Sequence, residues 1–121
     1  MENQVFCTPE TTVYRQVKDE LVVIQLESGK FFYFNPTTKE VLDYFKTPRS
    51  FGAFLIAAEA TPTSERGVQL REFCRLLLEN QLISEAESVS DSLVEAVKMS
   101  MPPSLIRRGE QTLDELTFLC P

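Results

Sequence analysis

The sequence predicts an α+β domain in which a three-stranded antiparallel meander precedes three helices and a C-terminal extension. Three observations indicate this fold. Short β-branched and aromatic runs alternate with turn residues over residues 13–34, as in consecutive strands. Apolar residues then recur at spacings of three and four over residues 41–80, the period of amphipathic helices. The length of 121 residues, with 43% hydrophobic and 25% charged side chains, suits one globular domain.

The strands are expected at residues 13–17, 21–26 and 31–34. The first alternates apolar and polar side chains, as a half-buried strand does, and the second is a β-branched run typical of a central strand. The intervening Glu27-Ser28-Gly29-Lys30 predicts a tight turn, because Gly29 can adopt a positive φ. Residues 1–12 are polar and contain a proline, so we expect a loose N-terminal arm.

Helices are expected from Asn35-Pro36 to about residue 47, from Ser50 to Glu59, and from about Glu65 to Asn80. Asparagine suits the N-cap of the first helix and proline its first turn, and Thr37 and Glu40 offer a capping box. The third helix carries a broad apolar stripe, formed by Leu70, Phe73, Cys74, Leu77 and Leu78.

The character of the chain changes after Ile83. Residues 84–100 begin rich in serine and acidic side chains, and predict a linker with a short amphipathic helix, since Val89, Leu93 and Val97 share one helical face. Residues 101–121 form a C-terminal tail with no clear period. The predicted organisation is therefore an arm at 1–12, a domain at 13–83, a linker at 84–100 and a tail at 101–121.

Charge and hydropathy disfavour several classes of partner. The net charge is −6, whereas binding to nucleic acid or to an anionic membrane surface requires a basic face. No apolar run approaches the roughly 20 residues that span a bilayer, and the N-terminus carries no basic region followed by an apolar segment. We therefore expect a cytoplasmic protein that binds neither nucleic acid nor membrane.

The sequence offers little for catalysis. It has no histidine, which removes the commonest general base and metal ligand, and no phosphate-binding or nucleophile-elbow motif. The cysteines Cys7, Cys74 and Cys120 form no metal-binding pattern, and Cys74 lies on the apolar stripe, where a thiol is more often a small hydrophobe than a nucleophile. We expect a non-catalytic protein without a cofactor or metal.

The aromatic run Phe31-Phe32-Tyr33-Phe34 is the feature that most strongly suggests a binding role. Adjacent strand residues face opposite sides, so a core on one side of the sheet buries Phe32 and Phe34 and leaves Phe31 and Tyr33 on the other. As an edge, this strand would offer unpaired backbone groups. Either the arm or tail covers that edge, or a peptide adds to it as a further strand.

The order of three short strands and three helices is also winged-helix-like, and in such domains the third helix reads the major groove of DNA. Three acidic residues accompany the three arginines of this helix, which favours a mixed, solvated face over a DNA-binding one. These are Arg66, Arg71 and Arg75, with Glu65, Glu72 and Glu79. A winged-helix regulator or a generic interaction adaptor is thus the alternative to a peptide-binding domain.

The segments ESGKFFYFNPTTKEVLDYF and FCRLLLENQLI resemble the PqqD-like family, also called RiPP recognition elements, and the small leader-binding proteins of lasso-peptide pathways. The resemblance covers about residues 13–83. It departs from the family at Gln69, where an acidic residue is usual, and at Gln81, where glycine is common.

The resemblance implies a peptide-modification chaperone of natural product biosynthesis. Such a protein binds the leader peptide of a precursor by strand addition and presents it to a separate enzyme, such as a radical SAM protein, a protease or a cyclase. Cys74 and Leu78 would line an apolar pocket, and Arg71 and Arg75 would meet acidic leader residues. The peptide would pair with the backbone of Lys30, Phe31, Phe32, Tyr33 and Phe34.

The tail itself resembles the leaders of lasso-peptide precursors, which carry Pro-x-Leu-x-x-x-Gly and a later threonine. The matching residues are Pro103, Leu105, Gly109 and either Thr112 or Thr117; Ser100 stands where such leaders usually have tyrosine. We hypothesise that the tail docks in the domain's own groove or in that of a neighbour, with Cys120 as a modifiable residue. A chance match is the alternative, and edge pairing into a homodimer is a further expectation.

Overall fold

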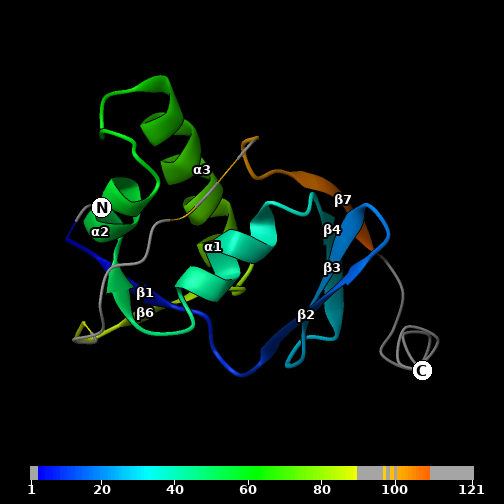
Figure 1. The fold of residues 1–121 in the computed structure, drawn as a ribbon. Helices are drawn as coiled ribbons and strands as arrows, with labels where there is room; N and C mark the ends of the chain where they lie inside the picture. The colour runs from blue at the N-terminus through cyan, green and yellow to red at the C-terminus, as the bar shows by residue number, and fades with distance from the viewer. Residues whose placement is uncertain (1–2, 90–96, 98, 100, 110–121) are drawn as a thin grey trace.

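A computed structural model describes residues 3–89, 97, 99 and 101–109 of the chain. Within these residues the fold is α+β, with two antiparallel sheets and three helices (Figure 1). The predicted α+β class is therefore confirmed, whereas the likeness to winged-helix domains stays a prediction. No helix in these ranges is both long enough and apolar enough to cross a membrane.

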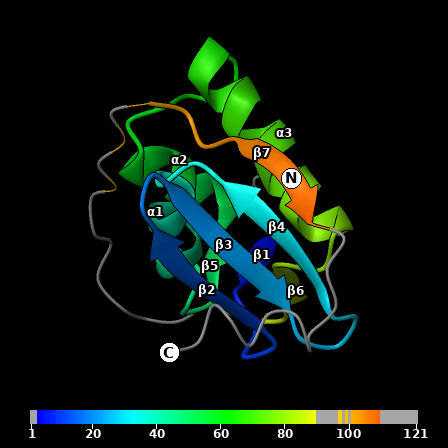
Figure 2. The same cartoon turned by 90° about the vertical axis from the view of Figure 1, so that its right-hand side faces the viewer.

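The larger sheet has the order β2-β3-β4-β7 (Figure 2). Its first three strands form the expected meander within one residue of the predicted bounds. Gly29 has a φ of 74° in the β3–β4 turn, as expected for a position that favours glycine. The strands are β2 (Thr12–Val17), β3 (Glu20–Gln25), β4 (Lys30–Phe34) and β7 (Leu105–Gly109).

The smaller sheet corrects two predictions. It has the order β5-β1-β6, and its strands are β1 (Val5–Cys7), β5 (Arg49–Ser50) and β6 (Ser84–Ala86). Part of the expected N-terminal arm is thus a central strand, and the expected linker begins as a strand. The physical reason is the burial of Phe6, which is 0% exposed and meets the rings of Phe45 and Phe51 edge-on.

The helices are α1 (Thr38–Tyr44), α2 (Phe51–Ala57) and α3 (Glu65–Glu79). Serines at positions 50 and 64 cap α2 and α3, as each hydroxyl accepts a backbone N–H. The predicted start of α1 is wrong: Thr37 is its N-cap and makes no side-chain capping bond, so the capping box is absent. Asn35 lies ahead of the helix, where its side chain accepts hydrogen bonds from the Thr38 hydroxyl and the Ser104 N–H.

The main core lies between the larger sheet and the helices. Phe32 and Phe34 of β4 join it, as predicted, and the Phe34 ring meets Phe73 of α3 at 5.7 Å between centroids. On the opposite face of the sheet, Phe31 is 1% exposed and forms a small second cluster with Val22, against which Ile24 and Tyr33 pack. The β4 strand therefore has apolar contacts on both faces.

Some expectations fall outside the described residues. They are most of the short helix expected between residues 89 and 99, the threonines Thr112 and Thr117, and Cys120.

Candidate functional site

The β4 strand is paired on both sides, because β7 adds to the edge that the meander leaves open (Figures 1 and 2). The pairing is antiparallel, with Phe31 opposite Gly109, Phe32 opposite Arg108 and Tyr33 opposite Arg107. The register shifts between Tyr33 and Phe34. Residues 101–109, called the docked segment below, therefore cover this edge of the sheet within the same chain.

Asn35 holds the N-terminal part of the docked segment. Its side-chain Nδ2 donates to the Pro102 carbonyl at 2.7 Å, and its Oδ1 accepts from the Ser104 N–H at 3.0 Å. The Asn35 backbone N–H donates to the Ser104 carbonyl at 2.9 Å. Thr38 orients the amide by donating its hydroxyl to Oδ1 at 3.1 Å. Because all three contacts with the segment use its backbone atoms, this clamp holds an extended strand without contacting a particular side chain.

A second anchor precedes the docked segment. The Arg66 guanidinium, at the start of α3, donates to the Met99 carbonyl at 2.8 Å and to the Ala58 carbonyl at 3.3 Å. The Val97 N–H donates to the Ala57 carbonyl at 3.0 Å. Arg66 thus binds protein backbone here, which gives no support to a role for this arginine in contacting phosphate.

Apolar and steric contacts fix the segment on β4. Pro103 is buried, and Leu105 packs against the main core. At Gly109 a Cβ atom would lie 2.7 Å from Phe31 Cδ2 and closer still to two other atoms of that ring. Because the Phe31 ring is buried, a strand in this register requires glycine at that position.

The outer face of the sheet holds a charged contact with the segment. The Arg107 guanidinium stacks on Tyr33, with its carbon 3.9 Å from the ring centroid. Its two terminal nitrogens bond the two carboxylate oxygens of Glu20, Nη2 to Oε1 at 3.2 Å and Nη1 to Oε2. Such a two-point contact fits the planar fork of arginine.

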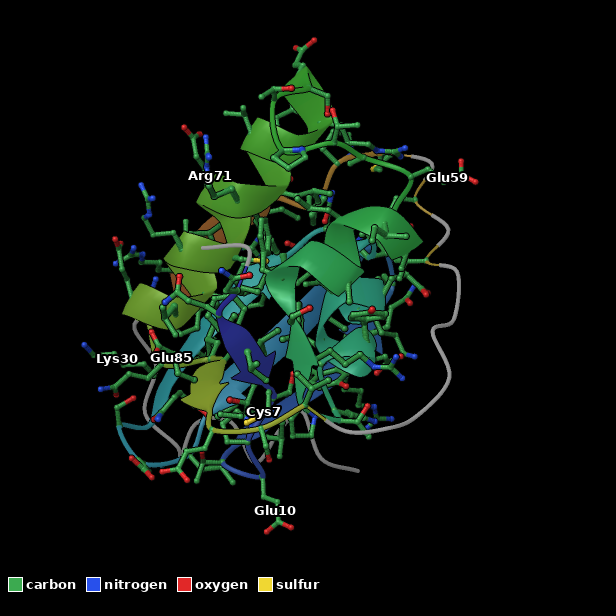
Figure 3. All side chains as sticks on the ribbon, turned by 90° about the vertical axis from the view of Figure 1, so that its left-hand side faces the viewer. Cys7, Glu10, Lys30, Glu59, Arg71 and Glu85 are labelled. Atoms are coloured by element: carbon green, nitrogen blue, oxygen red, sulfur yellow. The ribbon has the colours of Figure 1, made fainter. Side chains whose placement is uncertain are left out.

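The peptide-binding residues predicted on α3 differ in how far they are buried. Cys74 is fully buried in the main core, and desolvation by burial raises its pKa strongly, so its thiol is unsuited to nucleophilic chemistry. Arg71 is half-buried and projects outward from α3 (Figure 3), and Arg75 is exposed. Among the described residues no ion pair joins either arginine to β7.

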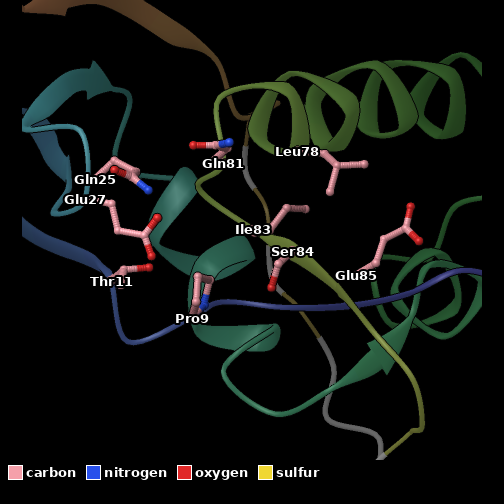
Figure 4. Close-up of a pocket in the computed structure, with 9 residues that line it drawn as sticks. All are labelled: Pro9, Thr11, Gln25, Glu27, Leu78, Gln81, Ile83, Ser84 and Glu85. Atoms are coloured by element: carbon pink, nitrogen blue, oxygen red, sulfur yellow. The ribbon is translucent and has the colours of Figure 1, made fainter.

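Leu78 does not face the docked segment. It lines a cavity of about 410 Å³ near the end of α3, together with Gln81, Ile83 and residues of the β3–β4 end of the sheet (Figure 4). None of the residues that line this cavity belongs to β4 or β7. Cys74 is not among the residues that line this cavity, so the apolar pocket implied for Cys74 and Leu78 together stays a prediction.

The described part of the chain holds no group of three or more histidine, cysteine or acidic residues that could bind a metal. Comparisons with protein-family models, with curated proteins and with solved structures return no match for the chain.

Proposed function

We propose that this chain is a non-catalytic peptide-binding domain of the RiPP recognition element type. It takes the leader segment of a ribosomally synthesised precursor as an additional strand on β4 and presents the precursor to a separate modifying enzyme. The observation that carries the proposal is the pairing of β4 with residues 105–109 of the same chain.

The contacts of the docked segment agree with recognition of a leader. Backbone pairing and the Asn35 clamp bind any extended strand, whereas three positions restrict the sequence. Pro103 is buried, Leu105 packs on the core, and Gly109 has no room for a side chain beside Phe31. These are the three residues of the Pro-x-Leu-x-x-x-Gly spacing through which the tail resembles lasso-peptide leaders.

The docked segment must be displaced before another peptide can use the same edge. Because it belongs to the same chain, it competes at a high effective concentration, of the order of millimolar as for other linked binding segments. The docked segment therefore competes with any precursor peptide for the β4 edge, and only a tightly binding or abundant precursor displaces it. A binding experiment with the unaltered chain alone would underestimate the affinity of the β4 edge for a peptide.

To test the proposal, the docked segment is released from the β4 edge by substitution, without shortening the chain. In a tail-released variant, Leu105→Asp places a carboxylate against the core and Gly109→Val places a side chain against Phe31. The probe is a labelled peptide with the sequence of residues 101–109. We expect it to bind the tail-released variant about tenfold more tightly than the unaltered chain, because the internal competitor is weakened, with fluorescence anisotropy as the readout.

The matched control is the same peptide carrying the two substitutions of the variant. It should bind neither protein, since both its core contact and its fit beside Phe31 are lost. Equal binding of the two peptides, or no binding of the unaltered peptide to the tail-released variant, would contradict recognition by strand addition on β4.

A further inference from the structure

One side chain of the docked segment reaches across a whole strand of the domain. Arg107 stands on β7, its guanidinium lies over Tyr33 on β4, and its partner Glu20 is on β3. Side chains at alternate positions of a strand share a face, so Glu20 lies on the same outer face as Val22, beside the small apolar cluster of Phe31. The contact thus spans three adjacent strands.

The partners of this guanidinium belong to the domain and not to the tail. Glu20 begins β3, directly after a turn in which Lys18 has a φ of 58°, and Tyr33 is held by an edge-on contact with Phe31 at 5.4 Å between ring centroids. Whatever strand occupies the β4 edge in this register would present its own side chain to the same pair.

We propose that Glu20 and Tyr33 form an arginine-reading subsite that selects which peptide strands bind the β4 edge. For peptides supplied by other chains the proposal rests on the proposed function. The partner is a peptide with the pattern Leu-x-Arg-x-Gly, in which leucine meets the core, arginine meets the subsite and glycine lies beside Phe31.

The chemistry of the subsite favours arginine over lysine. A guanidinium is planar, offers parallel N–H donors to a carboxylate and stacks on an aromatic ring, whereas an ammonium is a compact point charge without such a fork. The side chains of Arg107 and Glu20 are 52% and 31% exposed. Solvent therefore screens the ion pair, and the subsite discriminates between strands that the backbone and core contacts already hold.

The neighbouring arginine gives a matched control. Arg108 pairs with Phe32 and is exposed, and within the described residues no ion pair joins it to the domain. Substitution at 107 and at 108 removes the same charge from the same strand, but only position 107 faces the subsite.

The experiment titrates the tail-released variant, with and without Glu20→Gln, with peptides of residues 101–109. With Glu20 present, Arg107→Ala should weaken binding about three- to tenfold and Arg108→Ala less than about twofold. In the Glu20→Gln protein the effect of Arg107→Ala should shrink to less than about threefold, leaving the contact with Tyr33. A peptide with Arg107→Lys should lose most of the affinity that arginine adds at this position.

Equal losses at positions 107 and 108 would show general attraction to an acidic protein and would overturn the subsite. So would a loss at 107 that Glu20→Gln leaves unchanged. If no peptide binds the tail-released variant, the proposed function fails, and the subsite is decided within the full-length chain. In that chain, Glu20→Gln and Arg107→Ala should each speed amide exchange in residues 105–109. The double variant should exchange no faster than the faster of the two single variants, and additive effects would refute the pairing.

Discussion

Asn35→Ala should release the docked segment while leaving the rest of the fold in place. The substitution removes two side-chain hydrogen bonds to the segment, at 2.7 and 3.0 Å, and keeps the backbone bond from Asn35 to Ser104. Each such bond contributes about 0.5–1.5 kcal/mol net, so the docking free energy should fall by about 1–3 kcal/mol. Because Pro102 and Ser104 are exposed and water can replace the lost partners, the lower half of that range is expected.

The assay is amide hydrogen exchange of residues 105–109, followed by NMR. A loss of 1–2 kcal/mol corresponds to a fall in protection of about 5- to 30-fold. Asn35→Ala also deprives the buried Thr38 hydroxyl of its acceptor, which destabilises the whole domain. The amides of β3 serve as the internal reference for that global effect.

Thr12→Val is the matched control. The Thr12 hydroxyl donates to the Leu82 carbonyl at 2.8 Å in a buried position, on the strand of the sheet farthest from β7. It should lower protection in β3 and leave protection in residues 105–109 nearly unchanged, because the segment undocks locally without unfolding of the domain. If Asn35→Ala likewise leaves protection in residues 105–109 unchanged, Asn35 does not clamp the segment and the prediction is refuted.

Three further outcomes are expected. Gly109→Ala should cost about 1–3 kcal/mol of docking through overpacking against Phe31, measured by the same exchange; unchanged protection would contradict the steric argument. Burial raises the pKa of Cys74, so its alkylation should await global unfolding even in the tail-released variant, and labelling of the native protein would show that the residue lines the groove. Burial alone would raise the pKa of Asp43, but hydrogen bonds from neighbouring side chains hold it below its usual range. Its stabilising contribution is thus complete above the unfolded pKa of about 3.9 and is lost as pH falls through the folded value. Asp43→Asn should therefore reduce the fall in the free energy of unfolding at acid pH, measured by denaturant unfolding at several pH values. An unchanged dependence on pH would contradict this.

The meander and α3 could be predicted because their signals are local. Residues 13–34 show period-two alternation and a glycine turn, and residues 65–80 show a long apolar stripe. The small sheet could not be predicted in this way. Its strands are two or three residues long, too short to display a period, and their pairing depends on contacts between residues far apart in the chain.

The sequence indicated a site residue only where local structure, such as a turn, a helix start or a core strand, did not already account for that residue. A run of four aromatic residues cannot all enter one core, and this indicated the β4 edge. Asn35 was missed because Asn-Pro is explained locally as a helix start, and Glu20 because Lys18-Asp19-Glu20 suggests a turn. Both act on residues more than 60 positions away. The available signal was the resemblance of Pro103, Leu105 and Gly109 to the spacing of leader peptides, which suggested the hypothesis that the tail docks on the domain.

In the proposed function, β4 and Asn35 bind a peptide strand supplied by another chain. The most direct measurement is an NMR titration of the tail-released variant with the unlabelled peptide of residues 101–109. Binding by strand addition predicts the largest shifts at residues 30–35 and at Glu20, and intermolecular contacts between the peptide leucine and the core beside Phe34. Shifts confined to the cavity around Leu78, or spread evenly over the acidic surface, would contradict the claim.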